Sequence, residues 1–341
     1  MSIQPQRAIL LFSLFLISCL LSHPQLRTGV TNRPPDYDSL GGFPSALERV
    51  SEAAQAAPQS ELPSSGVGCS SVADAGEPRP MRILFHGYVD GQWRTYLGMV
   101  SSQGLSAVTD LTPSYGTTEL SHDGESVAYV TCGVPDPAIY ILGLTTSERW
   151  KVIPLGRVAY CPSVRWSFDD RMLSYESTTD YALHIVSVDG SNHIRLPATV
   201  RVGWHSWSPS GKEIVFETGH GGLRSLRIMD LHGNVRELTH LGDFNNCETW
   251  APDWSPDGTR ISFESCGRVF TVSPQGADVQ QLASGASGAY SPRWSADGQW
   301  IFFLSKSVLM RVRRDGQCLS RVADLPPPYS GSSPFSLGML Q

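Results

Sequence analysis

Short apolar runs that end in an aromatic residue recur along the chain, each directly after a tight-turn pentapeptide. The clearest copy is Trp-Ser-Pro-Asp-Gly at residues 254–258, which precedes the run Ile-Ser-Phe at 261–263. Partial copies lie at residues 120–124, 166–170, 207–211 and 294–298. Ser suits the first position of a type I turn, Pro fixes φ at the second, and Gly accepts a positive φ at the last. The pattern therefore predicts a strand, a tight turn and a second strand in each copy.

The copies are regularly spaced. Their last positions fall at residues 124, 170, 211, 258 and 298, at gaps of 46, 41, 47 and 40 residues. A second turn follows in most units, at residues 189–190, 232–233, 275–276 and 315–316. All-β units that repeat near every 40 residues are typical of propeller blades. We therefore expect four antiparallel strands (a to d) per unit, with tight a–b and c–d turns.

The repeat resembles that of TolB-type propellers, whose blades carry a Trp-Ser-Pro-Asp-Gly hairpin and a later Asp-Gly or similar turn. A further unit at residues 82–109 shows strands b, c and d. The expected fold class is thus all-β: a six-bladed propeller of four-stranded antiparallel blades over residues 80–324. Strand a of the first blade has two candidate sources, residues 66–73 and residues 334–340 of the C-terminal tail (325–341).

The N-terminus has the pattern of an export signal. Residues 1–18 begin with one Arg and no acid and continue as an apolar run. Leu-Ile-Ser-Cys at 16–19 resembles a bacterial lipobox, which implies a lipid on Cys19. By the same resemblance, Leu20 directly after Cys19 favours anchoring of the lipid in the outer membrane of a Gram-negative cell. Ordinary signal peptidase cleavage and an uncleaved anchor are the alternatives, although the run is shorter than the roughly 20 residues that span a bilayer.

Residues 19–79 are rich in Pro, Ser, Gly and Ala. Such a segment buries too little apolar surface to order itself, so we expect a mostly disordered tether. TolB itself has an ordered α/β domain ahead of its propeller, and this chain departs from it here. The export signal and the lipobox resemblance together imply a protein of the periplasm or the cell surface that is anchored to the membrane by a lipid.

Composition and motifs narrow the function. The net charge of −6 argues against nucleic-acid binding, which needs a basic footprint. No His-Glu-x-x-His, Gly-x-Ser-x-Gly or phosphate-loop sequence is present. We therefore predict no catalytic residue, cofactor or metal, and expect a monomeric, non-enzymatic scaffold for an envelope protein or glycan.

Antiparallel order places the b–c loops and d–a connections on one side of the ring, the loop face, and the tight turns on the other, the turn face. Loops on a rigid scaffold are where binding residues collect, so the loop face is the candidate functional face. Four cysteines are expected there: Cys132, Cys161, Cys247 and Cys266. Cys247 and Cys266 would be neighbours in one hairpin, and Cys132–Cys161 would bridge adjacent blades.

An exported chain meets an oxidising compartment, where such disulfides persist. The remaining pair, Cys69 and Cys318, is assigned by elimination and would tie the tether to the last blade. Buried free thiols are the alternative.

An aromatic residue ends strand b in every predicted blade, namely Phe85, Tyr129, Tyr175, Phe216, Phe263 and Phe303. The next position is Glu176, Glu217 and Glu264 in three consecutive blades. These carboxylates suggest a site for a cation or a cationic partner near the channel mouth. Pairing with Arg165 and Arg293 of strands a, or plain solvation, is the alternative.

Two histidines are further binding candidates on the loop face. His86 occupies the same position as the glutamates in the first blade, and His220 lies in a glycine-rich loop. The alternative function is a metal-dependent, lyase-like envelope enzyme, because lyases with similar blades use a His-rich metal site on this face. His86, His205, His220 and His240 would supply its ligands.

Overall fold

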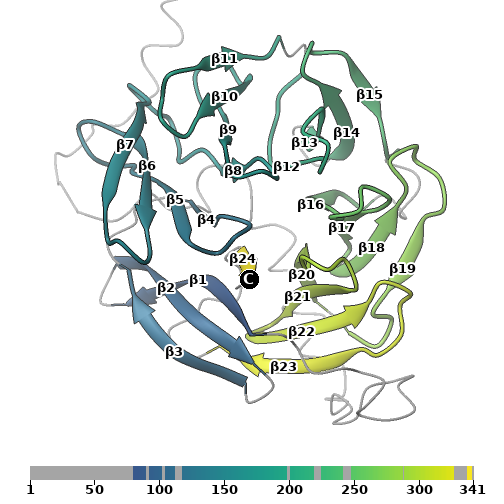
Figure 1. The fold of residues 1–341 in the computed structure, drawn as a ribbon. Coiled ribbons are helices and arrows are strands. Elements are labelled where there is room, and N and C mark those ends of the chain that lie inside the picture. The colour runs from purple at the N-terminus through teal and green to yellow at the C-terminus, as the bar shows by residue number, and fades with distance from the viewer. Residues whose placement is uncertain are drawn as a thin grey trace, which may run out of the picture. The chain divides into compact units, whose positions relative to one another are not determined.

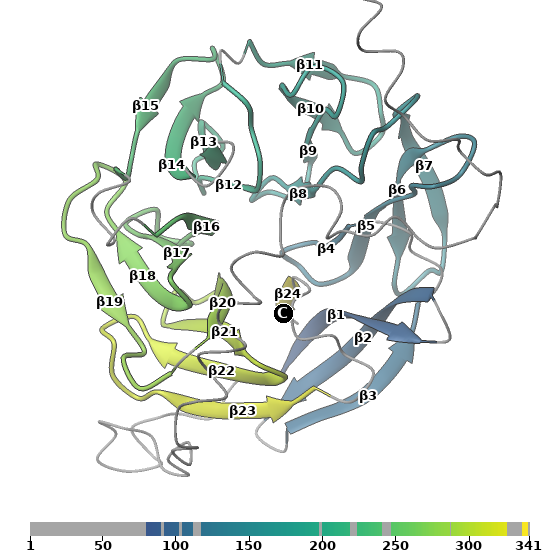
Figure 2. The same ribbon diagram turned by 180° about the vertical axis from the view of Figure 1, so that it is seen from behind.

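The computed structural model describes residues 80–89, 92–101, 104–111, 117–197, 200–218, 224–240, 247–286, 288–325 and 336–339. They form six four-stranded antiparallel sheets, arranged as blades in a ring (Figure 1). Both views show one strand of each blade at the centre and the last strand at the rim (Figure 2). The predicted fold class is confirmed. No helix in the described part of the chain is long and apolar enough to cross a membrane.

The first three blades follow one another around the ring. From the centre outward, blade 1 contains β24 (Ser336–Met339), β1 (Met81–Val89), β2 (Gln92–Ser101) and β3 (Gly104–Asp110). Blade 2 contains β4 (Thr118–Leu120), β5 (Ser126–Val130), β6 (Ala138–Gly143) and β7 (Arg149–Pro154). Blade 3 contains β8 (Val164–Trp166), β9 (Met172–Glu176), β10 (Leu183–Ser187) and β11 (His193–Arg195).

The remaining blades keep the same order of strands. Blade 4 contains β12 (His205–Trp207), β13 (Glu213–Thr218), β14 (Ser225–Asp230) and β15 (Val235–Glu237). Blade 5 contains β16 (Thr249–Trp254), β17 (Ile261–Ser265), β18 (Arg268–Val272) and β19 (Gln280–Leu282). Blade 6 contains β20 (Ala289–Trp294), β21 (Trp300–Ser305), β22 (Val308–Arg313) and β23 (Ser320–Asp324).

Blade 1 is completed by the end of the chain. β24 pairs antiparallel with β1, with Leu84 opposite Ser336 and Met81 opposite Met339. The structure thus supports the C-terminal source of strand a. Residues 66–73 lie outside the described residues, as do the predicted signal segment, Cys19, Cys69 and His220.

The pentapeptide turns are closed by their own side chains. Oγ of Ser255 donates to Oδ1 of Asp257 (2.7 Å) and accepts the backbone N–H of Arg260 (2.9 Å). The carbonyl oxygen of Ser255 accepts the N–H of Gly258 at 2.9 Å. Gly258 has φ of 72°, a conformation that favours glycine. This is the tight a–b turn that the sequence predicts.

The core is divided into one apolar cluster for each pair of neighbouring blades. Trp254, for example, packs with Val215 and Ile228 of blade 4 and with Phe263 of its own blade. Equivalent clusters join the other five pairs, including blades 6 and 1. Burial of apolar surface between blades therefore stabilises the ring at every junction.

The motif tryptophans differ in their polar atoms, and this predicts a stability difference. Nε1 of Trp207 donates to Oγ of Ser174 in blade 3 at 2.7 Å. Nε1 of Trp254 is buried with no hydrogen-bond partner among the described residues. We expect Trp207→Phe to lower the free energy of unfolding by about 1 kcal/mol more than Trp254→Phe does, because only the first breaks a hydrogen bond. Urea unfolding of both variants measures this, and equal losses would contradict it.

Candidate functional site

The three glutamates predicted from the sequence lie at the loop-face ends of β9, β13 and β17. Burial, together with the negative charge of Glu217, raises the pKa of Glu264 to about 8. The carboxyl groups of Glu217 and Glu264, which lie in neighbouring blades, therefore interact with one another. Together Glu176, Glu217 and Glu264 are called the acidic row.

Glu176 is enclosed by blades 3 and 4, and Nδ1 of His205 in blade 4 lies 4.0 Å from its Oε2. Its side chain accepts hydrogen bonds from the backbone N–H and the hydroxyl of Ser163, at 2.7 Å and 2.5 Å. Burial raises the pKa of Glu176 to about 8, against the effect of these hydrogen bonds. A buried carboxyl with such a pKa is substantially protonated at neutral pH.

Glu217 has a basic partner from its own blade. Nη1 of Arg224 donates to Oε1 of Glu217 at 2.7 Å, while Oε2 is buried and has no partner among the described residues. Burial raises the pKa of Glu217 to about 7, and the charge of Arg224 opposes the rise. Pairing with Arg165 and Arg293, the alternative considered from the sequence, is not the arrangement that the structure shows. Arg165 pairs with Glu119 instead.

The histidines considered for a metal site are dispersed. The ring of His86 lies between the hydroxyl groups of Thr95 and Thr118, and burial lowers its pKa to about 4. His205 is fully buried and hydrogen-bonded to Oγ of Ser174 at 2.8 Å. In the part of the chain that the structure describes, no three His, Cys, Asp or Glu side chains are grouped to hold a metal ion.

The disulfides predicted for the loop face are present. Cys132 and Cys161 join blades 2 and 3, with their Cα atoms 5.7 Å apart. Cys247 and Cys266 join the start of strand a to the end of strand b in blade 5, with a Cα separation of 5.5 Å. Cys318 is also disulfide-bonded. Its predicted pairing with Cys69 stays a prediction, because Cys69 lies outside the described residues.

Aromatic and arginine side chains gather on the loop face. The guanidinium of Arg201 lies 4.6 Å from the ring centre of Tyr181 and 5.9 Å from that of Tyr160. The guanidinium of Arg224 lies 3.9 Å from the ring centre of Trp250. These five residues, called the loop-face patch, come from blades 3, 4 and 5 and their connections.

The patch adjoins the acidic row. Burial raises the pKa of Tyr160, and the charge of Glu176 adds to the rise. Arg224 belongs to both groups, because it stacks on Trp250 and binds Glu217. No motif in the sequence marks the patch, since four of its members lie in irregular loops or connections of different blades and Trp250 lies in β16.

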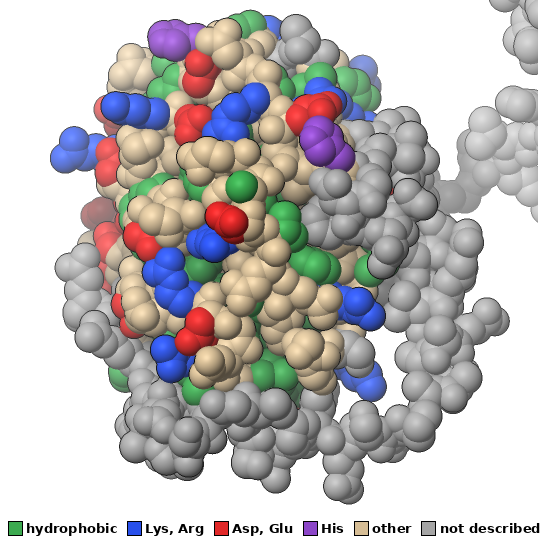
Figure 3. Space-filling view, turned by 90° about the vertical axis from the view of Figure 1, so that its right-hand side faces the viewer, with side chains coloured by type: hydrophobic (Ala, Val, Ile, Leu, Met, Phe, Trp, Pro, Cys, Tyr) green, Lys and Arg blue, Asp and Glu red, His purple; other side chains and the backbone are tan. Residues whose placement is uncertain are grey.

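The outer rim of the propeller differs from the loop-face patch in that its charged side chains are of both signs. Seen from the side of β15 and β19, acidic and basic side chains are interspersed (Figure 3). Arg227 pairs with Glu237, and Arg236 pairs with Glu213, at 3.0 Å and 3.1 Å. Exposed pairs of this kind contribute little and offer no single-sign surface to a charged partner.

A second set of polar residues, which sequence reasoning missed, lies on the innermost strands. Each precedes the last residue of strand a in blades 2 to 6, and they are Glu119, Arg165, Ser206, Asp253 and Arg293. Nη1 of Arg165 donates to Oε2 of Glu119, and its Nε donates to the carbonyl oxygen of His205 at 3.0 Å. Oδ2 of Asp253 accepts the N–H of Trp294 at 2.8 Å. We call this set the central ring. In the sequence its members directly precede the first residue of each turn pentapeptide, which is Trp in blades 3 to 6 and Leu120 in blade 2, and this shared position could have revealed them.

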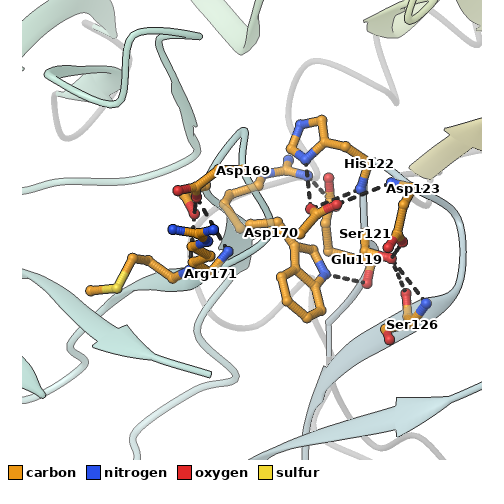
Figure 4. Close-up of polar contacts among 12 residues, drawn as sticks. Glu119, Ser121, His122, Asp123, Ser126, Asp169, Asp170 and Arg171 are labelled. Carbon is orange, nitrogen blue, oxygen red and sulfur yellow. Dashed lines mark hydrogen bonds and ion pairs between the residues drawn. The ribbon is translucent and has the colours of Figure 1, made fainter. Parts of the chain in front are cut away.

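One turn beside the central ring uses an acid in place of glycine. Asp170 has φ of 56°, and its carboxylate accepts the backbone N–H groups of His122 and Asp123 at 2.9 Å and 3.0 Å. It also binds the ring of His122 (Figure 4). Desolvation lowers the pKa of His122, but the hydrogen bond and charge of Asp170 outweigh it and leave the pKa above its ordinary value.

Comparison with known proteins identifies the family of this chain. A family model described as the TolB beta propeller domain matches residues 104–323. An uncharacterized protein of Agrobacterium fabrum, Atu1656, is 32% identical over 107 residues, which are 30% of this chain and 35% of that protein. The match thus spans about a third of the relative's length.

Solved structures agree in fold. TolB from Acinetobacter baumannii aligns with a TM-score of 0.60 at 17% identity, over 76% of this chain and 66% of that one. A putative TolB from Agrobacterium tumefaciens gives 0.56 at 19% identity, over 75% and 91%. An oligogalacturonate lyase in complex with manganese gives 0.51 at 17% identity, over 71% and 73%. At these identities the likeness shows the fold alone.

Proposed function

The chain belongs to the TolB β-propeller domain family, and we propose that it is a non-enzymatic binding scaffold of the bacterial cell envelope. Its partner is a protein that docks on the loop face; a glycan is the alternative ligand. The export pattern of residues 1–18 supports the location, and the pattern at Cys19 supports a lipid anchor, in the outer membrane of a Gram-negative cell.

The loop-face patch carries this proposal. Arginine and aromatic residues are enriched at protein interfaces and dominate their binding energy. Here two arginine–aromatic stacks stand on neighbouring blades, and Tyr181 keeps 43% of its surface exposed. The disulfide between Cys132 and Cys161 holds the connection that carries Tyr160 against blade 2, so part of the patch is ordered before binding.

The acidic row supports a protein partner more than a metal ion. Glu217 is engaged by Arg224, and Glu176 by Ser163. Glu176 is substantially protonated at neutral pH and one oxygen of Glu217 is held by Arg224, so these two groups do not offer the several free ionised oxygens that a hard cation needs. The lyase alternative has no ligand set among the described histidines, while His220 lies outside the described residues.

We expect Tyr181→Ala to weaken partner binding roughly tenfold, since exposed aromatic anchors are typical hot spots. Crosslinked capture from envelope extract, followed by affinity measurement with the purified partner, tests this. Leu231→Ala is the matched control, because Leu231 is 40% exposed but lies in a c–d turn on the turn face. Equal losses in the two variants would exclude the loop face. Binding of a polysaccharide instead of a protein would identify the glycan alternative.

A further inference from the structure

The central ring repeats a three-residue pattern around the propeller axis. The register of β24 with β1 places Ser336 at the blade 1 position, because it lies opposite Leu84 just as Glu119 lies opposite Ala128. In blade order the ring positions are Ser336, Glu119, Arg165, Ser206, Asp253 and Arg293. The order serine, acid, arginine thus occurs twice.

The two halves of the ring use their charges differently. Glu119 reaches Arg165 in the next blade and forms an ion pair with it. Asp253 is one methylene shorter, and its Oδ2 accepts the backbone N–H of Trp294 instead. Among the described residues, the second arginine, Arg293, forms no ion pair of the kind that Arg165 forms, although the charges of Asp253 and Glu119 act on it.

Arg293 is buried with open donors. Only 4% of its surface is exposed, and its Nη1 donates to the carbonyl oxygen of Pro292 at 3.1 Å. Its Nε and Nη2 have no hydrogen-bond partner in the described part of the chain. Leaving such charged donors unsatisfied is costly. Nε and Nη2 share one edge of the guanidinium, the fork that binds the two oxygens of a carboxylate.

The charged side chains of the ring interact with one another electrostatically. Burial raises the pKa of Asp253, and the charges of Arg293, Arg165 and His122 oppose the rise. His122 belongs to blade 2, which lies opposite blade 5 in the ring, and Arg165 belongs to blade 3, two blades from blade 5 (Figures 1 and 2). Their charges therefore reach Asp253 across the centre. His122 is 41% exposed in its side chain, so solvent reaches this end of the propeller.

We propose that the central ring is a carboxylate-binding site, in which Nε and Nη2 of Arg293 bind both oxygens of one ligand carboxylate. Two acids and two arginines make the ring neutral, and one unused guanidinium edge fits a planar group with a single negative charge. The ring residues lie beside the a–b turns, at the turn-face ends of the innermost strands, and none of them belongs to the loop-face patch.

The test is titration of the full-length chain with sodium acetate, against sodium chloride at equal ionic strength, by calorimetry. We expect saturable binding to the wild type and a loss of roughly tenfold or more in Arg293→Met, which removes the charged fork. Asp253→Glu keeps every charge but supplies an internal carboxylate long enough to reach Arg293, so it should abolish acetate binding as well. Lys212→Ala, which removes an exposed turn-face cation, should bind as the wild type does.

Binding that survives both ring substitutions would overturn the site, and so would the absence of saturable binding to the wild type, because water would then fill the fork. The thermal unfolding of each variant is recorded, and Asp253→Glu decides the matter if Arg293→Met does not fold. A blocked Ala-Glu-Ala peptide identifies the source of the carboxylate. Tighter binding than acetate indicates a protein side chain, and binding of acetate alone indicates a small organic acid.

Discussion

A variant that ends at Phe335 is expected to lose more stability than any single substitution in the propeller. The deletion removes β24, the innermost strand of blade 1. It leaves the inner edge of β1 unpaired from Met81 to Leu84 and uncovers Ile83 and Leu84, which are 0% and 1% exposed. Uncovering two or three large apolar side chains costs on the order of 5 kcal/mol, before the lost strand pairing is counted.

Thermal unfolding followed by circular dichroism measures the loss, beside a variant that ends at Met339 and keeps the whole of β24. The control should unfold as the full-length chain does. If the deletion to Phe335 had little effect, the four-residue pairing with β1 would be dispensable, and residues 66–73 would again be the candidate for strand a of blade 1.

This deletion tests the part of the fold that the sequence left open. Five blades carry the turn pentapeptide, whose local chemistry identifies strands a and b without reference to the rest of the chain. Blade 1 lacks a pentapeptide because its two inner strands come from opposite ends of the propeller sequence. Pairing between such distant segments depends on tertiary structure, and no local pattern specifies it.

The candidate site was also predicted only in part, because its regular strand positions can be read from the sequence and its loop contacts cannot. The spacing of strand-b ends placed Glu176, Glu217 and Glu264 in one row, since a repeat preserves the level of each residue in its blade. Their partners were not predicted. Arg224 and Ser163 lie outside the regular strands, and their approach to the carboxyl groups is set by how each loop folds over the strand ends.

The central ring was missed although its residues lie in a regular column. The position before each motif Trp holds an acid, a base or a hydroxyl, so it has no constant chemistry along the sequence. The role of this position depends on closure of the propeller ring, which brings blades 2 and 5 to opposite sides of the central axis. A single residue at such a position resembles any surface charge until the ring is formed.

Glu176→Gln is expected to stabilise the protein at alkaline pH and to change little in acid. Glu176 has a pKa of about 8 in the folded protein and an ordinary value of 4.5. Between these pH values the folded chain holds a proton that the unfolded chain releases. The stabilising contribution of the protonated carboxyl is therefore complete below pH 4.5 and is lost as the pH rises through 8.

The loss by pH 8 is on the order of 4 kcal/mol for one such group. Glutamine has the shape of the protonated acid, can accept the N–H of Ser163, and has no proton to release. Urea unfolding at pH 5 and pH 8 should show a wild type that weakens and a Glu176→Gln variant that weakens much less.

Glu237→Gln is the control, since Glu237 is 52% exposed and paired on the surface; its unfolding should follow the wild type at both pH values. The buried histidine His205 gives the opposite slope. Burial lowers its pKa to about 3, so stability falls as the pH drops below the ordinary histidine value. The wild type should thus be most stable in mild acid, and Glu176→Gln should move that maximum to higher pH. A maximum that stays in place would show that Glu176 is ionised in the folded protein, held so by the hydrogen bonds from Ser163.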